Sequence, residues 1–340
     1  MSRRPLLLFV CACLLVPAGL LASGSAGAGV LDPSPVMFGT VGNRPGLPSI
    51  RATVEQAEDQ LNRPMAAVRI YDFWNTTFPQ NHHRWLRNTG HTIYLSVKSE
   101  LENGTDIPWA DVADAPKGSP IHDNIVRWAR KLRDFGDPIH FTFNHEPETG
   151  HNTHRGTPRD YREAWRRIVK VFRKKGADDN VTFTWIMTDH AFRVGENDRR
   201  YAPNWWPGED YVEEMGADVY NWFECRPEQD IPWRTPAYLM EGYRQFGAQY
   251  PGIPMSLPEW ATVEDPDQPG RKAEFIGQMQ NLLQEPEWSQ MKSVLYFNRP
   301  GTAYPTCNWA FDSSESSRAA LETMGADPWY QRSESINYPA

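Results

Sequence analysis

The chain has 340 residues, 40% of them hydrophobic, which is enough for one sizeable globular domain. Its formal net charge of −8 excludes the basic surface that nucleic-acid-binding domains usually carry. Like-charge repulsion also disfavours polyanionic substrates. We therefore expect a neutral ligand and no nucleic-acid partner.

The first 28 residues have the pattern of a secretory signal peptide. Arg3 and Arg4 precede an apolar run that ends near Leu21, and small residues follow up to Ala28. This order is typical of a cleavable export signal, and a membrane anchor is the weaker alternative. We predict a secreted protein, residues 29–340, that is not attached to a membrane. Since cleavage removes two arginines and no acidic residue, the formal charge moves from −8 to −10.

Four cysteines are present, and two of them, Cys11 and Cys13, lie within the predicted signal. The other two are Cys225 and Cys307. Thiols in an oxidising compartment tend to pair, so we predict a disulfide between these two residues. Two separate buried thiols are the alternative.

Short apolar or β-branched runs, typical of buried strands, alternate with helical patterns after residue 35. The predicted strands are Val36–Val41, Ala67–Tyr71, Thr92–Val97, Ile139–Asn144, Val181–Met187, Ala217–Tyr220, Pro254–Leu257 and Ser293–Phe297. The main predicted helices are Val54–Leu61, Ile121–Phe135, Thr157–Lys175, Thr235–Tyr250 and Arg271–Leu283.

This alternation predicts an α/β fold, a (β/α)8 TIM barrel, as a single domain. A doubly wound sheet is the alternative. That fold usually carries a glycine-rich phosphate loop after its first strand, and Gly39–Gly42 lacks most of the pattern.

Two glutamates stand where predicted strands end. Glu146 follows the fourth strand, within Phe141–Gly150, and Glu259 follows the seventh, within Ile253–Trp260. Active sites of TIM barrels lie at the carboxyl ends of the strands, where strands four and seven face each other. The two carboxyls are then expected about 5 to 5.5 Å apart, as in retaining glycosidases. We predict Glu259 as the nucleophile and Glu146 as the acid/base, the alternative for a lone glutamate being a solvated loop residue.

Three segments resemble glycoside hydrolase family 26, best known for β-mannanases, within the clan of retaining barrel enzymes. They are His145–Glu146, Trp206–Tyr220 and Leu257–Ala261. The resemblance implies that His145 binds or orients sugar and that Tyr220 hydrogen-bonds the nucleophile. A buried core histidine and a buried tyrosine are the alternatives. The activity implied is that of a retaining endo-β-1,4-mannanase.

The chain departs from the family pattern at three places. Thr142 replaces a usual arginine, Phe297 ends strand eight in place of a frequent tryptophan, and His151–Arg155 stand where an aromatic cluster is expected. These departures leave other β-glycans open as substrates, namely mixed-linkage glucan, xylan or an exopolysaccharide. A carbohydrate-binding pseudoenzyme is a further alternative, although both glutamates are present.

Several tryptophans near predicted strand ends are candidates for stacking on sugar rings, with core packing as the alternative for each. The candidates are Trp74, Trp205 and Trp222, with Trp185 as a fourth. Arg69 on the second strand is a candidate support for the nucleophile. We expect a polysaccharide or oligosaccharide substrate and a monomer.

Histidines close to Glu146 raise a metal-site alternative, because histidine and carboxylate groups are zinc ligands. They are His145, His151 and His154, beside Glu146 and Glu148. The metalloprotease pattern is not met, since Thr149 stands at its second histidine position and Pro147 would break the helix. No Gly-x-Ser-x-Gly serine hydrolase motif occurs. We therefore expect neither a metal nor an organic cofactor.

Overall fold

The computed structural model describes residues 36–226, 228–301 and 306–331, and the predicted signal peptide lies outside these ranges. Eight parallel strands pair in the order β2-β3-β4-β5-β6-β7-β8-β1, and β1 pairs with β2 to close the barrel. The strands are β1 (Val36–Val41), β2 (Ala67–Phe73), β3 (Thr92–Lys98), β4 (Ile139–Phe143), β5 (Val181–Thr188), β6 (Glu214–Asn221), β7 (Met255–Thr262) and β8 (Met291–Tyr296). The predicted TIM barrel is confirmed.

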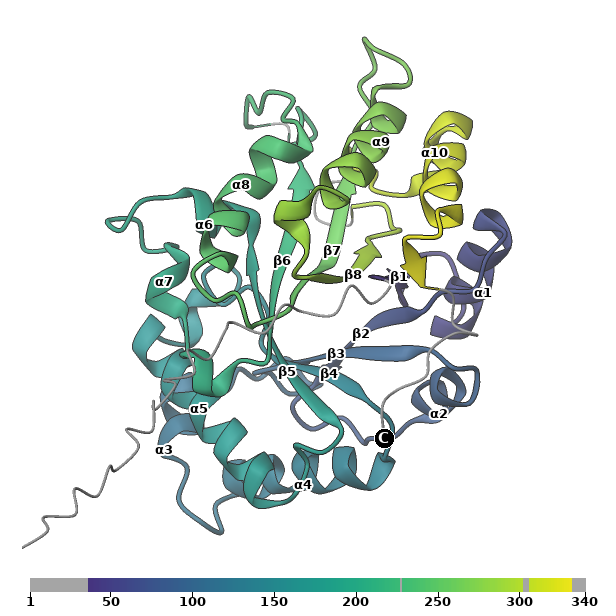
Figure 1. The fold of residues 1–340 in the computed structure, drawn as a ribbon. Coiled ribbons are helices and arrows are strands. Elements are labelled where there is room, and N and C mark those ends of the chain that lie inside the picture. The colour runs from purple at the N-terminus through teal and green to yellow at the C-terminus, as the bar shows by residue number, and fades with distance from the viewer. Residues whose placement is uncertain (1–35, 227, 302–305, 332–340) are drawn as a thin grey trace, which may run out of the picture. The chain divides into compact units, whose positions relative to one another are not determined.

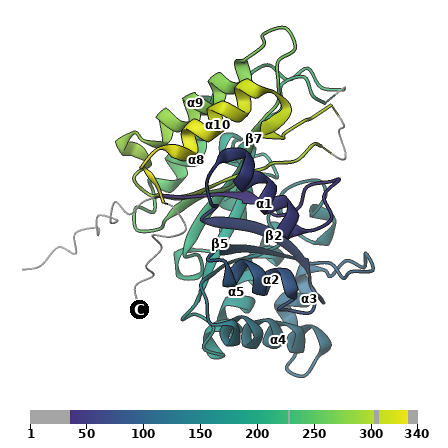
Figure 2. The same ribbon diagram turned by 90° about the vertical axis from the view of Figure 1, so that its right-hand side faces the viewer.

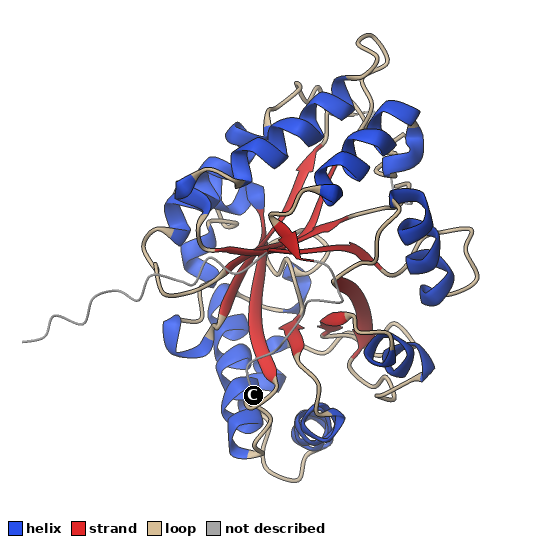
Figure 3. Ribbon diagram, turned by 45° about the vertical axis from the view of Figure 1, so that its right-hand side comes forward, coloured by secondary structure: helices blue, strands red, loops and turns tan. Residues whose placement is uncertain are grey.

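Helices form a ring outside the strands (Figures 1 and 3). They are α1 (Ile50–Leu61), α2 (Asn81–Asn88), α3 (Trp109–Asp114), α4 (Pro120–Phe135), α5 (Pro158–Lys174), α6 (Asp189–Arg193), α7 (Ala202–Trp205), α8 (Pro236–Gly247), α9 (Arg271–Leu283) and α10 (Glu315–Ala326). Figure 2 shows α9 and α10 side by side, and α10 also contacts α1. No helix in the described part of the chain is both long enough and apolar enough to cross a bilayer.

The start of α5 shows how local sequence sets an element boundary. Thr157 caps the helix by accepting a hydrogen bond from the Asp160 backbone, and the Asp160 side chain accepts one from the Thr157 backbone. Pro158 occupies the first helical position, where a missing N–H costs nothing. Short polar helices such as α2 escaped prediction because they have too few apolar residues to show a helical period.

The seventh strand continues past its predicted end. Pro258 has no N–H to donate, so it suggested a strand end after Leu257. The structure instead shows irregular pairing between Leu257 and Trp260, and β7 runs on to Thr262. Glu259 therefore lies within the strand and not after it, and its Cα pairs with that of Asp218 on β6. A bulge of this kind, common next to active sites, redirects side chains at the barrel rim.

The first strand approaches its neighbour too closely for a side chain at Gly39. A Cβ there would lie 2.2 Å from the carbonyl oxygen of Ala67 on β2. We expect Gly39→Ala to lower the free energy of unfolding by about 2 to 3 kcal/mol, because a backbone atom must move to relieve the clash. Urea denaturation measures this, with Gly277→Ala on α9 as control, since a Cβ there meets nothing within 4 Å. Equal stability of the two variants would contradict the predicted clash.

Candidate active site

The backbone after β4 turns sharply and presents Glu146 at the barrel mouth. Asn144 and Glu146 have φ angles of 45° and 49°, a left-handed conformation that few non-glycine residues adopt. Asn144 accepts a hydrogen bond from the Ser99 backbone at 3.1 Å. The Asn152 side chain donates to the carbonyls of His145 and Glu146 at 3.1 and 2.9 Å. Strained backbone held by its surroundings in this way is a frequent feature of functional sites.

Three donors from β2 and β6 converge on the Glu259 carboxylate. The hydroxyls of Tyr71 on β2 and Tyr220 on β6 each donate a hydrogen bond to one of its oxygens. Arg69 Nη1 lies 3.1 Å from Glu259 Oε1 and 2.7 Å from Asp218 Oδ1. Burial raises the pKa of both tyrosines well above the usual value, so both remain protonated donors. The negative charge of Glu259 is thus stabilised and its position is fixed.

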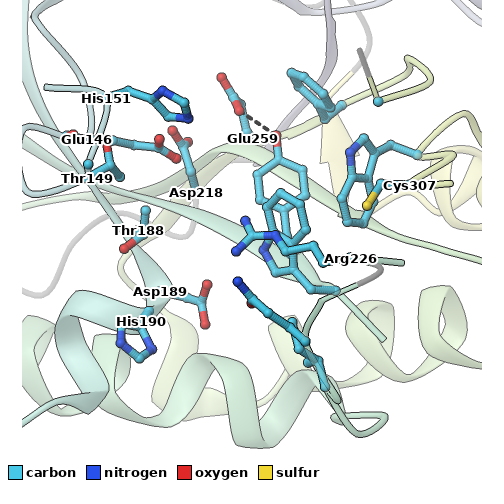
Figure 4. Close-up of a pocket in the computed structure, with 18 of the residues that line it drawn as sticks. Glu146, Thr149, His151, Thr188, Asp189, His190, Asp218, Arg226, Glu259 and Cys307 are labelled. Atoms are coloured by element: carbon cyan, nitrogen blue, oxygen red, sulfur yellow. Dashed lines mark hydrogen bonds between the residues drawn. The ribbon is translucent and has the colours of Figure 1, made fainter. Parts of the chain in front are cut away.

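Glu146 has a different environment from Glu259. Burial, followed by the charges of Asp218 and Glu259, raises the pKa of the Glu146 carboxyl well above its usual value. One carboxylate oxygen from each of Glu146, Asp218 and Glu259 lies within 4.8 Å of the other two, and Figure 4 shows the three side chains around one space. Two carboxyls this close, one favoured in its protonated form and one held by donors, suit acid/base and nucleophilic roles.

His145 lies against Tyr71, with ring centroids 5.5 Å apart. Burial and the nearby Arg69 charge lower the pKa of this histidine well below its usual value, so the ring is neutral. It is not among the described residues that line the cavity next to Glu146 and Glu259. The structure therefore places His145 beside a residue that holds Glu259, whereas we had expected it to contact sugar.

A cavity of about 780 Å³ opens over Glu146 and Glu259, and Trp222 lines it as expected for a sugar-stacking residue. Two other tryptophans do not reach it. Trp74 is 2% exposed and packs against Phe143, and Trp205 is 1% exposed and packs against Trp109. Their prediction as sugar-binding residues was wrong, because the surrounding helices and strands cover both rings.

Sequence reasoning missed two aromatic residues of the site. Tyr71 follows Arg69 by two positions on β2, so strand alternation could have placed both side chains inside the barrel. Trp309 lines the cavity, and its ring lies 4.9 Å from that of Tyr220, which also contacts Phe297 at 5.4 Å. No sequence signal marked Trp309, which lies 13 positions after the end of β8.

The loops that carry Trp222 and Trp309 are joined covalently. Cys225, in the loop after β6, forms a disulfide with Cys307, in the segment after β8, and their Cα atoms lie 4.8 Å apart. Cys307 itself lines the cavity. Cross-linking two loops that carry cavity residues restricts how far the wall between them can move.

Residues 119–231, which include Glu146 and Tyr220, match the model of glycosyl hydrolase family 26. The match covers 113 of the 340 residues, so over that segment the chain is similar to family 26.

Proteins similar to this chain differ strongly from it in sequence. Endoglucanase H of Acetivibrio thermocellus is 24% identical over 299 residues, and the match covers 84% of this chain but only 30% of that protein. A family 26 β-mannanase from Bacteroides ovatus has a TM-score of 0.59 at 16% identity, covering 88% of this chain and 91% of that one. An endo-β-1,4-mannanase from Cellulomonas fimi has a TM-score of 0.61 at 15% identity, covering 90% and 73%. The structural likeness at these identities establishes the shared fold.

The carboxylates of Glu146, Asp218 and Glu259 are close enough to contact one cation, but Arg69 already contacts two of them. A fixed guanidinium there disfavours a metal ion. A second cluster is formed by Asp72, His82 and His83. The Gln80 N–H donates to His83 Nδ1 at 3.0 Å. His83 Nδ1 is thereby occupied as an acceptor, and His83 Nε2 lies 3.2 Å from Asp72 Oδ2.

The three histidines considered as metal ligands do not form a shared cluster within the described residues. His154 Nε2 lies 2.7 Å from Asp106 Oδ2, and His151 lines the cavity. His145 packs on Tyr71, as described above.

Removing one donor from Glu259 is expected to slow turnover without unfolding the protein. We expect Tyr71→Phe to lower kcat/KM by about 10- to 100-fold, because a hydrogen bond to a charged group contributes roughly 1.5 to 3 kcal/mol. Initial rates and thermal melting measure the two effects separately. An unchanged rate in a folded Tyr71→Phe protein would contradict the role of this hydroxyl.

Proposed function

We propose that this chain is a secreted, endo-acting retaining β-glycosidase that cleaves β-1,4-mannosidic bonds, with Glu259 as nucleophile and Glu146 as acid/base. One observation carries the assignment of roles. The two carboxyls lie within 4.8 Å of each other, and only Glu259 receives three donors. Retaining enzymes need this short separation, since it leaves no room for a water between nucleophile and sugar.

In the first step, the Glu259 carboxylate attacks the anomeric carbon. The bond from that carbon to the leaving oxygen breaks, and Glu146 gives its proton to that oxygen. In the second step, Glu146 takes a proton from a water, which attacks the same carbon and releases Glu259. Two inversions at one carbon leave the β configuration unchanged.

The pKa of Glu146 supports both of its tasks. The negative charge of Glu259 contributes to the raised pKa of Glu146. Once Glu259 has become a neutral ester, that contribution is lost and the pKa of Glu146 falls. The group is thus a proton donor in the first step and a better proton acceptor in the second.

The names of similar structures support mannan as the substrate, because the Bacteroides ovatus and Cellulomonas fimi proteins are β-mannanases. A β-glucan is the second candidate, since the similar Acetivibrio thermocellus protein is named an endoglucanase. Export is inferred from the basic, apolar and small-residue order of residues 1–28.

Release of reducing sugar from galactomannan, glucomannan, lichenan and xylan tests the proposal. We expect release from galactomannan or glucomannan, and no release by the Glu259→Ala protein. Release from lichenan alone would replace mannan by a mixed-linkage glucan. Binding without release from any polymer would favour a carbohydrate-binding pseudoenzyme.

A further inference from the structure

Arginine side chains form much of the wall of the cavity that contains Glu146 and Glu259. They come from the segments that follow β5, β6 and β8, and are Arg193, Arg199, Arg200, Arg226, Arg234 and Arg299. Figure 4 shows Arg226 between Glu259 and Asp189. The positive charge is therefore local to the cavity of an otherwise acidic chain.

Most carboxylates that line the cavity already have hydrogen-bond or ion-pair partners within the protein. Asp218 and Glu259 contact Arg69, which comes from inside the barrel. Glu148 is fully buried and accepts hydrogen bonds from the Thr188 backbone and hydroxyl at 2.8 and 2.6 Å. Burial also raises the pKa of Glu148 to about 7, so it carries only part of a negative charge at neutral pH. Of the two remaining lining carboxylates, Asp189 pairs with Arg193, and burial raises the pKa of Glu146 well above its usual value.

Three of the arginines have no carboxylate partner within the described ranges. Arg200 pairs with Asp198 and Arg193 with Asp189, whereas no described carboxylate oxygen lies within 4.0 Å of Arg199, Arg234 or Arg299. Hydroxyls of an uncharged sugar can accept hydrogen bonds from such guanidinium groups, but only an anionic group also offsets the cost of taking their charge out of water. The cavity thus favours a ligand that brings negative charge.

Aromatic rings alternate with these arginines. The Arg226 guanidinium lies 3.4 Å over the centre of the Trp222 ring, and Arg299 lies 5.5 Å from that of Phe297. Aromatic faces suit the apolar faces of sugar rings, and the planar guanidinium fork suits two oxygens of one anionic group. The disulfide between Cys225 and Cys307 joins the loops that carry this wall.

We propose that the cavity takes a β-glycan bearing anionic groups, carboxylate or sulfate, which bind Arg199, Arg234 and Arg299 while the backbone lies over Glu146 and Glu259. This inference rests on the proposed function for the bond that is cut. It replaces our expectation of a neutral polymer, which was drawn from the net charge of the whole chain. Net charge describes the average surface, whereas binding depends on the charges within the cavity.

Binding to three forms of one galactomannan tests the proposal: unmodified, oxidised to carboxylate at the galactosyl C6, and sulfated. The Glu259→Ala protein is used so that the polymer stays intact. We expect at least about tenfold tighter binding of one charged form, since a charge-assisted hydrogen bond contributes roughly 1.5 to 3 kcal/mol. The preferred form distinguishes carboxylate from sulfate.

Arginine variants in the same background locate the effect. Arg234→Gln and Arg299→Gln are each expected to reduce the ratio of charged-form to unmodified-form affinity by roughly threefold or more, and circular dichroism checks that they fold. Arg51→Gln, an exposed residue on α1 that pairs with Glu55, is the matched control and should not change the preference. Equal binding of charged and unmodified polymers, or an equal loss in the control, would overturn the proposal.

The outcome also separates this inference from the proposed function. Hydrolysis of unmodified galactomannan by the wild-type protein, without preference for a charged form, would support the mannanase assignment and overturn the anionic ligand. Preferential binding of a charged form that the wild-type protein never cleaves would support the anionic ligand and overturn the mannanase assignment. Failure to bind any form would overturn both.

Discussion

Replacing Glu259 with alanine is expected to lower the turnover of polysaccharide on the order of 10⁵-fold, a loss typical of removing a covalent nucleophile. No other cavity carboxylate receives the same set of donors, because Tyr71, Tyr220 and Arg69 all point at Glu259. Initial rates of reducing-sugar release measure the loss.

Folding and sugar binding of this variant should be close to those of the wild-type protein. The carboxylate touches the cavity, and the aromatic residues that line it, such as Trp222 and Trp309, are unchanged. Circular dichroism and affinity electrophoresis serve as controls, with Glu259→Gln as the variant of equal size. Full activity in either folded variant would remove Glu259 as the nucleophile.

Replacing Glu146 with alanine is expected to affect substrates according to their leaving groups. A polysaccharide needs its departing oxygen protonated, so its kcat/KM should fall on the order of 10³-fold. A dinitrophenyl glycoside leaves without protonation, so its kcat/KM should fall by less than about tenfold. Steady-state kinetics on the two substrates measures the difference. Equal losses on both would contradict the role of Glu146 as acid/base.

The pH profile gives an independent check of the same residue. Glu146 must be protonated in the first step, and its pKa is raised above that of an ordinary glutamate. The wild-type kcat/KM should therefore stay high beyond the usual range of a carboxylic acid and fall as the pH rises through this raised pKa. That alkaline fall should be absent for the dinitrophenyl glycoside with Glu146→Ala, and its persistence would assign the fall to another group.

Elements that the barrel buries were predictable because burial leaves a signature in local sequence. Strands of a parallel sheet covered by helices consist of nearly continuous apolar runs, and all eight runs became strands. Glu146 and Glu259 stood out because a charged residue ends or interrupts such a run. Their approach to within 4.8 Å followed from the topology of the barrel, which brings β4 and β7 to the same mouth.

Features that depend on tertiary packing were not predictable from local sequence. Trp74 directly follows β2 just as Trp222 directly follows β6, and only the packing of neighbouring residues decides which of them reaches the cavity. The arginines that line the cavity lie far apart in the sequence, between Arg193 and Arg299. No local sequence pattern marks residues that only the fold brings together. The inward position of Tyr71 could be predicted from strand alternation once β2 had been placed.

Covalent trapping tests most directly that Glu259 is the nucleophile of a retaining glycosidase. An activated 2-deoxy-2-fluoro-β-mannoside forms the glycosyl-enzyme but slows its hydrolysis, so the ester can be located by mass spectrometry of peptides. We predict one label, on Glu259, and no label in the Glu259→Ala protein. A label on Glu146 or another residue, or no label on an enzyme that still cleaves mannan, would contradict the assignment.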